Sequence, residues 1–255
     1  MDFVESLTNG ILIKRYRRFL ADILLADGSI ITAHCPNTGT MLSCSIPDSP
    51  VCLSRSVNPT RKYPFTLEMI KIGMTWVGVN TGRTNALVVE AIEKGQITEL
   101  GAFDEIKKEV KVTDHTRLDL QIMHKDCGST FLEIKTCSLA IDGCAMFPDA
   151  VTARGTRHLQ ELARLSRAGF GAGIFFLVQR MDADRFAPAA DIDPIYSKAL
   201  GEAIAAGVRV FVYQALVSPT GIQVVRPLPY SLPNLSKLPC SSCFDGAVLV
   251  TARCE

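Results

Sequence analysis

The sequence lacks the long hydrophobic runs and the targeting features that would connect it with a membrane. No apolar run in its 255 residues reaches the ~20 residues that a membrane-spanning helix requires. The first ten residues, MDFVESLTNG, contain neither the basic nor the apolar segment of a signal peptide. Nine cysteines are scattered without a repeated spacing, so nothing indicates a disulfide framework. We therefore expect a cytoplasmic protein with reduced thiols and no membrane partner.

An excess of charge of one sign is also missing, and tryptophan is scarce. The 27 Lys and Arg residues nearly balance the 26 Asp and Glu residues, which leaves a formal net charge of +1. This balance excludes a polyanion-binding field over the whole molecule, so any nucleic-acid interface must be a local patch. Trp76 is the only tryptophan, which argues against a sugar-binding barrel with stacked tryptophans. No helix-turn-helix pattern is evident, so major-groove recognition of a base sequence has little support.

Apolar material, in contrast, is plentiful, because hydrophobic residues make up 47% of the chain and can fill a sizeable core. In the first 82 residues, short apolar segments at 19–25, 30–33, 51–54 and 75–80 are separated by turn residues. Short strands of this kind are typical of a small barrel or sandwich. We predict that residues 1–82 form an OB-like five-stranded β-barrel, a fold that often binds single strands through basic grooves and stacking aromatic rings.

Two basic clusters with aromatic residues lie within this predicted barrel. The candidate nucleic-acid-binding residues are Lys14, Arg15, Tyr16, Arg17, Arg18, Arg61, Lys62 and Tyr63. Cations of this kind can hold a phosphate backbone while a ring stacks on a base. The alternative is a solvated strand edge, where Lys and Arg prevent pairing with another sheet. The sequence leaves both interpretations open.

The region from 83 to 228 alternates between helical and strand patterns. Apolar residues at helical spacing predict helices at 85–94, 155–168 and 194–206. A continuous apolar run at 174–178 is typical of a strand buried on both faces. This order indicates an α/β domain in which helices flank a mixed sheet, so the whole chain is α+β.

Other segments of the chain have weaker patterns. We expect a short helix at 103–108 and a strand at 141–145. Residues 229–255 contain two Leu-Pro steps, several serines and few charges, and we interpret them as a peripheral tail. Cys240 and Cys243 form a single CxxC in that tail. Without a second pair, such a motif is weak evidence for zinc binding or redox chemistry.

The most informative stretch is RLDLQIMHKDCGSTFLEIKT, residues 117–136. Apolar and polar residues alternate with a period of two on both sides of a polar turn, which predicts an antiparallel hairpin. If the hairpin is centred near residue 126, Asp119 lies opposite Glu133, because the two are equally far from the centre. Opposed residues share one face with Cβ atoms about 5 Å apart. Lys135, two residues after Glu133, points to the same face.

Two carboxylates this close repel each other, so that either one keeps its proton or the pair holds a cation. Mg²⁺, or Mn²⁺ in its place, prefers oxygen ligands. Such an ion could polarise a phosphodiester and lower the pKa of a water, while Lys135 assists the attacking water. Asp119, Glu133 and Lys135 are therefore the candidate catalytic residues. The alternative is an ordinary Glu–Lys pair on a solvated strand face.

A set of short motifs extends from about residue 10 to residue 228. The motifs are Arg15-Tyr16, Phe19 to Asp22, His34 to Gly39, Arg61 to Pro64, Val79 to Thr81, Glu109 to Lys111, Asp119, Glu133 to Lys135, Phe147 to Thr152, Arg154-Gly155 and His158-Leu159. Together they resemble the bacterial sugar fermentation stimulation protein A family. The resemblance implies an OB-like domain at 1–82 and, at 83–228, a restriction-endonuclease-like domain similar to the PD-(D/E)xK nucleases. It also implies DNA binding and a link to the regulation of sugar metabolism, notably that of maltose.

In that nuclease superfamily, an acidic residue and a later Glu-x-Lys bind Mg²⁺ and assist hydrolysis. Asp119, Glu133 and Lys135 match these positions, although Leu118 stands where the superfamily name has proline. Such nucleases often add a glutamate from the first helix. Glu90 is the candidate for this third metal ligand, and Glu109 is its competitor.

Two functions from different classes follow from these observations. The first is a hydrolase, a Mg²⁺-dependent nuclease that acts on DNA. The second is a non-enzymatic DNA-binding regulator, in which the nuclease-like domain is only structural. A homo-oligomer is compatible with both.

Overall fold

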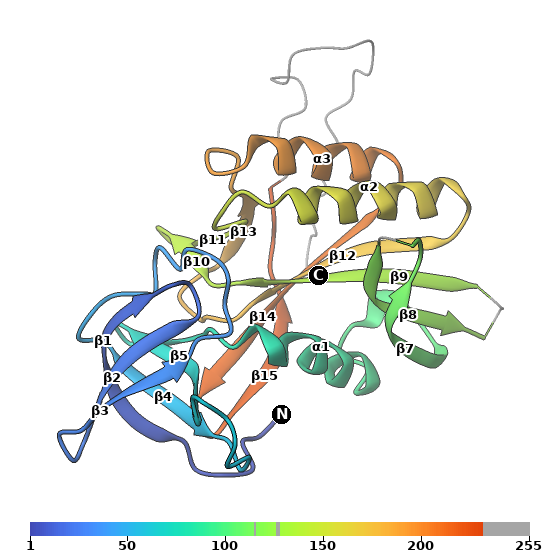
Figure 1. Cartoon of the computed structure of the whole chain (residues 1–255). Helices are drawn as coiled ribbons and strands as arrows, with labels where there is room; N and C mark the ends of the chain where they lie inside the picture. Colours follow the sequence, from blue (N-terminus) through green and yellow to red (C-terminus); the bar gives the residue numbers. More distant parts are fainter. Residues whose placement is uncertain (115, 126–127, 232–255) are drawn as a thin grey trace.

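The computed structural model, which describes residues 1–114, 116–125 and 128–231, consists of a barrel followed by a mixed sheet between helices (Figure 1). The strands of the first part are β1 (Thr8–Tyr16), β2 (Leu20–Leu25), β3 (Ile30–His34), β4 (Pro50–Arg55), β5 (Phe65–Ile72) and β6 (Thr75–Gly78). The remaining elements are η1 (Thr81–Arg83), α1 (Thr84–Glu93), η2 (Thr98–Leu100), β7 (Phe103–Lys111), β8 (Arg117–His124), β9 (Ser129–Cys137), β10 (Leu139–Ile141), β11 (Cys144–Phe147), α2 (Ala153–Arg167), β12 (Gly171–Val178), β13 (Arg185–Pro188), α3 (Pro194–Ala205), β14 (Arg209–Ser218) and β15 (Gly221–Pro227).

The N-terminal strands close into a five-stranded barrel. Their order is β3-β2-β1-β4-β5-β6, in which a parallel contact between His34 of β3 and Thr66 of β5 closes the first five strands and β6, among the described strands, pairs with β5 alone. Closure leaves no long strand edge exposed. Leu12, Ile23 and Leu67 are among the fully buried residues that fill the interior. The OB-like barrel predicted from the short strands is confirmed.

The second part has three layers around a six-stranded sheet of order β15-β14-β12-β9-β8-β7. Strand β12 is parallel to its neighbours β9 and β14, and the other pairs are antiparallel. Helices α2 and α3 lie side by side on one face, and α1 lies on the opposite face (Figure 1). Because both faces are covered, residues 174–178 in β12 are completely buried. The α+β class, with helices flanking a mixed sheet, is confirmed.

The two helices on the first face begin at recognisable capping residues. Thr152 accepts a hydrogen bond from the Gly155 amide at the start of α2. Asp193 accepts one from the Tyr196 amide at the start of α3, where Pro194 occupies the first helical position. These caps fix where α2 starts, and α2 contributes a residue to the site described below.

Two local predictions were wrong. The expected helix at 103–108 is part of strand β7, and the single strand expected at 141–145 is a hairpin, in which Ile141 ends β10, residues 142–143 form the turn and Cys144 begins β11. β7 is an edge strand, and such a strand can expose many charged residues on its solvated side. In the hairpin, Asp142 and Gly143 have φ values of +48° and +75°, which interrupt an extended strand.

The expected tail begins with an ordered contact. The Phe186 amide donates to the Pro229 carbonyl at 2.9 Å, and the Ser231 amide donates to the Phe186 carbonyl at 3.0 Å. Residues 232–255, which include Cys240 and Cys243, lie outside the described residues. Within the part of the chain that is described, no helix combines the length and apolar character needed to cross a membrane.

Candidate functional site

The central hairpin pairs in the register that the sequence predicts. Leu120 lies opposite Leu132, and Ile122 lies opposite Thr130. This pairing ends at Leu120 and Leu132, and Asp119 on β8 and Glu133 on β9 are the next residue of each strand. The two predicted acids are close enough for the charge of Glu133 to act on Asp119.

Asp119 is held in place by donors from two elements. Its Oδ2 accepts a hydrogen bond from the Ile134 amide at 2.7 Å, and its Oδ1 accepts one from Asn85 Nδ2 at 2.9 Å. Asn85 lies in the first turn of α1, on the face of the sheet opposite to α2. Burial, followed by the negative charge of Glu133, raises the pKa of Asp119 above its usual value.

Glu133 lies in the interior, with only 2% of its surface exposed. Its Oε1 accepts hydrogen bonds from Lys135 Nζ and from His158 Nδ1. Burial acts to raise the pKa of Glu133, but the His158 hydrogen bond and the Lys135 charge outweigh it, and the pKa is lowered. Glu133 is therefore an ionised carboxylate beside an acid that is harder to ionise.

The second oxygen of Glu133 differs from the rest of the cluster. Glu133 Oε2 is buried and has no hydrogen-bond partner among the described residues. A buried acceptor left without a partner costs stability, and native structures seldom contain one without a functional reason. An unpaired carboxylate oxygen of a residue whose charge acts on a second carboxylate is suited to ligate a hard divalent cation.

A cation at this point would still need further ligands. Across the described ranges, no three His, Cys, Asp or Glu side chains converge closely enough to hold a metal ion by themselves. Mg²⁺ typically keeps several waters and uses one or two carboxylates together with substrate phosphates. The Asp119–Glu133 pair fits that pattern and does not fit a closed structural metal site.

Glu90, the expected third ligand, belongs to a different cluster. Its carboxylate pairs with the Met1 ammonium group at 2.8 Å and with Lys94 at 2.5 Å. No described contact connects it with Asp119 or Glu133. The structure therefore does not bring Glu90, the predicted metal ligand, to the acid pair, and α1 presents Asn85 to Asp119 instead. The competitor, Glu109, is an exposed residue of β7.

Two residues of the site were not assigned from the sequence. His158 appears in one of the motifs quoted above, but its role depends on α2 packing over β9. Asn85 is the second residue of α1, a helix in which only a glutamate was sought as a ligand. One signal in the sequence could have identified His158: it is a polar residue directly before Leu159 of the apolar helix face. The structure shows that His158 is indeed buried, with 6% of its surface exposed.

The candidate nucleic-acid residues gather at one rim of the barrel. Adjacent strands align Tyr16 with Leu20, Leu20 with His34, and His34 with Thr66. Arg61 lies at the same rim as His34, because its Nη2 is 3.4 Å from His34 Nδ1. The clusters at 14–18 and 61–63, which are distant in the sequence, therefore form one surface, which we call the barrel rim.

The residues of the barrel rim differ in how far they are exposed to solvent and free to contact a ligand. Lys14, Arg17, Arg18 and Lys62 are exposed. Arg17 and Arg18 have φ values of +49° and +63°, a conformation that is costly for residues with side chains. The turn therefore exposes two cations to solvent, although its backbone conformation is energetically unfavourable.

Arg15, in contrast, is bound within the protein. Its guanidinium donates to the carbonyl oxygens of Asn37, Gly39 and Arg18 at 2.7, 2.8 and 2.8 Å. The loop that it holds continues to Met41, whose amide donates to Asp149 Oδ2 at 3.0 Å. Arg15 therefore connects the barrel rim to the second domain through this loop, and Tyr16 is tied to Asp22 by a 3.0 Å hydrogen bond.

Comparison with known proteins finds similarity over nearly the whole chain. Residues 13–79 match the family model described as the SfsA N-terminal OB domain, and residues 82–221 match the sugar fermentation stimulation protein RE domain. A sugar fermentation stimulation protein homolog of Desulfotalea psychrophila is 53% identical over 232 residues, which cover 91% of this chain and 95% of the relative. The homolog of Pelobacter propionicus is 46% identical over 229 residues, covering 90% and 99%.

The chain is also similar in fold to a solved structure of a relative. The chain is similar to Pyrococcus furiosus SfsA, which was determined in complex with Ca²⁺. The two are 27% identical and superpose with a TM-score of 0.83 over 91% of this chain and 98% of the other. The barrel and the mixed sheet therefore occur together in this relative as well.

Proposed function

The chain belongs to the sugar fermentation stimulation protein family, and we propose that it is a metal-dependent nuclease that hydrolyses phosphodiester bonds of DNA. The observation that carries the proposal is the acid pair, in which Glu133 is buried and Asp119 is half-buried. Glu133 Oε2 has no hydrogen-bond partner among the described residues, and the pKa of Asp119 is raised by burial and by the neighbouring charge. Two acids in this relation favour a shared cation.

Each residue of the cluster has a chemical role in this proposal. Asp119 and Glu133 would bind Mg²⁺ or Mn²⁺, which would polarise the phosphodiester and lower the pKa of a bound water. Lys135, with its ammonium group beside Glu133, stabilises the charge that develops during attack. Asn85 and His158 orient the two carboxylates. The Ca²⁺ complex of the Pyrococcus furiosus relative supports an oxygen-ligand site for a divalent ion.

The barrel rim would supply DNA binding. Exposed Lys14, Arg17, Arg18 and Lys62 can contact phosphates without reading the base sequence. Lys62 lies over the ring of Tyr63 at 5.4 Å, so a cation and an aromatic face are available at the same place. The likeness of residues 13–79 to an OB domain supports this assignment.

One observation favours a second candidate function, that of a non-enzymatic DNA-binding regulator. Both oxygens of Asp119 and one of Glu133 already have donors within the protein, so most of the cluster is satisfied without an ion. The domain could then serve as a scaffold for the barrel rim. A connection with sugar metabolism rests on the name of the family alone.

A cleavage assay separates the two candidates. Labelled single- and double-stranded DNA is incubated with the wild type or with Glu133→Gln, in Mg²⁺, Mn²⁺ or EDTA. We expect the wild type to cleave only with metal. The substitution should lower the rate about a thousandfold, because it removes a charged ligand while preserving the shape of the side chain.

Glu202→Gln is the matched control, since Glu202 lies on α3 and pairs with Lys198 at 3.7 Å, away from the acid pair. This variant should cleave at the wild-type rate. DNA binding without cleavage by the wild type in either metal would favour the regulator. Equal cleavage by the wild type and Glu133→Gln would exclude the acid pair as the active site.

A further inference from the structure

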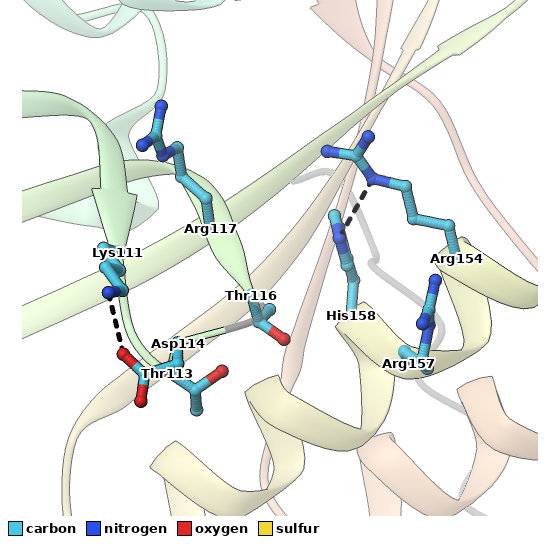
Figure 2. Close-up of a pocket in the computed structure, with 8 residues that line it drawn as sticks. All are labelled: Lys111, Thr113, Asp114, Thr116, Arg117, Arg154, Arg157 and His158. Carbon is cyan, nitrogen blue, oxygen red and sulfur yellow. Dashed lines mark hydrogen bonds and ion pairs between the residues drawn. The ribbon is translucent and has the colours of Figure 1, made fainter.

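A basic hollow adjoins the acid pair on the side of α2 (Figure 2). It has a volume of about 450 Å³ and is lined by Lys111, Thr113, Asp114, Thr116, Arg117, Arg154, Arg157 and His158. One wall comes from the end of β7 and the start of β8, and the other comes from the first turns of α2. We call it the α2 pocket.

The α2 pocket contains more positive charge than its own residues neutralise. Four cations and one acid, Asp114, give the lining a formal charge of +3 with His158 neutral. Lys111 pairs with Asp114 at 2.8 Å, while the side chains of Arg117 and Arg157 have no ion pair or hydrogen bond to any described residue. Cations gathered in a concave site without counter-charge repel each other and favour an anion.

The position of α2 increases this effect. Arg154 lies in the first turn of the helix, and that turn contains no acidic residue. The N-terminus of a helix carries partial positive charge, so basic residues there are unfavourable unless an anion binds. The helix N-terminus and the arginines therefore both favour the binding of an anion in the α2 pocket.

His158 joins the α2 pocket to the acid pair. Arg154 Nε donates to His158 Nε2 at 3.3 Å, so a neutral imidazole carries its proton on Nδ1 and donates it to Glu133 Oε1. A single imidazole ring therefore separates a guanidinium of the α2 pocket from a carboxylate of the acid pair. An anion in the pocket would lie beside the site where the proposed hydrolysis takes place.

We propose that the α2 pocket binds a phosphate group of the DNA strand next to the bond that is cleaved, an inference that rests on the proposed nuclease function. Guanidinium groups match the geometry of phosphate oxygens, and Arg117 and Arg157 belong to opposite walls of the pocket. A volume of about 450 Å³ exceeds that of a bare phosphate and falls in the range of pockets for small molecules such as nucleotides. The phosphate belongs either to a strand end or to an internal phosphodiester.

The test compares two double variants that remove the same charge. Arg117→Gln with Arg157→Gln changes the α2 pocket and leaves Arg154, which contacts His158, intact. Arg164→Gln with Arg167→Gln is the control, because both residues lie on α2 near its other end. DNA affinity is measured at several salt concentrations in EDTA, so that cleavage does not contribute.

We expect the pocket variant to bind DNA about tenfold more weakly at low salt and to reduce the salt slope by about 1 to 2. The control variant should match the wild type, and Arg117→Lys with Arg157→Lys should restore most of the slope, because it keeps the charge. Equal affinity and equal slope in the pocket and control variants would overturn the proposal.

Oligonucleotides with phosphate or hydroxyl ends identify the source of the phosphate. If the wild type binds oligonucleotides with a phosphorylated end more tightly and only the pocket variant loses this preference, the pocket binds a terminal phosphate. If the ends make no difference to affinity but the pocket variant binds every oligonucleotide more weakly, the pocket binds an internal phosphate. If inorganic phosphate binds the wild type but the pocket variant binds DNA normally, the pocket is a free-anion site and the proposal is wrong. Absence of cleavage by the wild type, in contrast, contradicts the nuclease function and not the pocket.

Discussion

The acid pair and the barrel rim use charged residues in opposite ways. Glu133 is 2% exposed, and all but one of the carboxylate oxygens of the pair are bonded within the protein. Arg17 and Arg18 are exposed on a turn whose backbone conformation is unfavourable for them. A charge that has partners inside the protein contributes to structure and pre-organisation, whereas a charge without partners is available to a ligand.

Arg15 tests this distinction most strongly, because its sequence neighbours belong to the barrel rim but its contacts are internal. Arg15→Gln should destabilise the fold by about 2–3 kcal/mol, since three close carbonyl contacts are lost and two of their acceptors, those of Asn37 and Gly39, remain partly buried. Thermal unfolding should show a fall in Tm of roughly 5–10 °C. An unchanged Tm together with weaker DNA binding would place Arg15 with the DNA-contacting residues.

His158 tests the same distinction within the acid pair. His158→Ala should weaken Mn²⁺ binding and lower the cleavage rate, each about 10- to 100-fold, because Glu133 loses the donor that orients it. Mn²⁺ titration by calorimetry and the cleavage assay measure the two effects. His158→Gln should recover part of both, since an amide can donate to Glu133. Loss of Tm with normal Mn²⁺ affinity would indicate a purely structural role.

The exposed half of the barrel rim should respond differently. Combining Arg17→Gln, Arg18→Gln and Lys62→Gln should weaken DNA binding about tenfold at low salt and reduce the salt slope by about 2 to 3. Tm and Mn²⁺ affinity should stay at their wild-type values, because these side chains are exposed. Lys71→Gln in combination with Lys107→Gln and Lys198→Gln removes the same charge elsewhere and serves as control. A salt slope equal to that of this control would argue against the barrel rim as the DNA surface.

The smallest expected effect is the pH dependence of metal binding. The pKa of Asp119 is raised by burial and by Glu133, so protons compete with metal at a higher pH than for an ordinary aspartate. Glu133, whose pKa is lowered, stays ionised in the same range. Mn²⁺ affinity should therefore fall a few-fold between pH 7 and pH 5 while circular dichroism remains unchanged. A constant affinity over this range would contradict the raised pKa.

The hairpin was predictable because its information is local. Period-two alternation and a short turn set the register, and the observed pairing of Leu120 with Leu132 follows from it. The helices of the second domain were predictable for the same reason, since apolar spacing and caps are local signals. What the sequence could not supply was the set of residues that other elements bring to the hairpin.

Glu90 illustrates that limit. Helical periodicity places Asn85 and Glu90 on α1, but the choice between them depends on how α1 lies across the sheet. Met1, which is 89 residues away, takes the Glu90 carboxylate, and Asn85 reaches Asp119. The helix expected at 103–108 failed because the Lys and Glu residues there suit both a helix and an exposed edge strand. In both cases tertiary packing decided the outcome.

Calorimetric titration of the DNA-free protein with Mn²⁺ is the decisive test of metal binding by the acid pair. We expect one ion per chain for the wild type and for Glu90→Gln, and loss of that binding in Asp119→Asn and in Glu133→Gln, with all four proteins folded. Retention of the ion by both of the latter variants, or its loss in Glu90→Gln alone, would contradict the assignment of the metal to the acid pair.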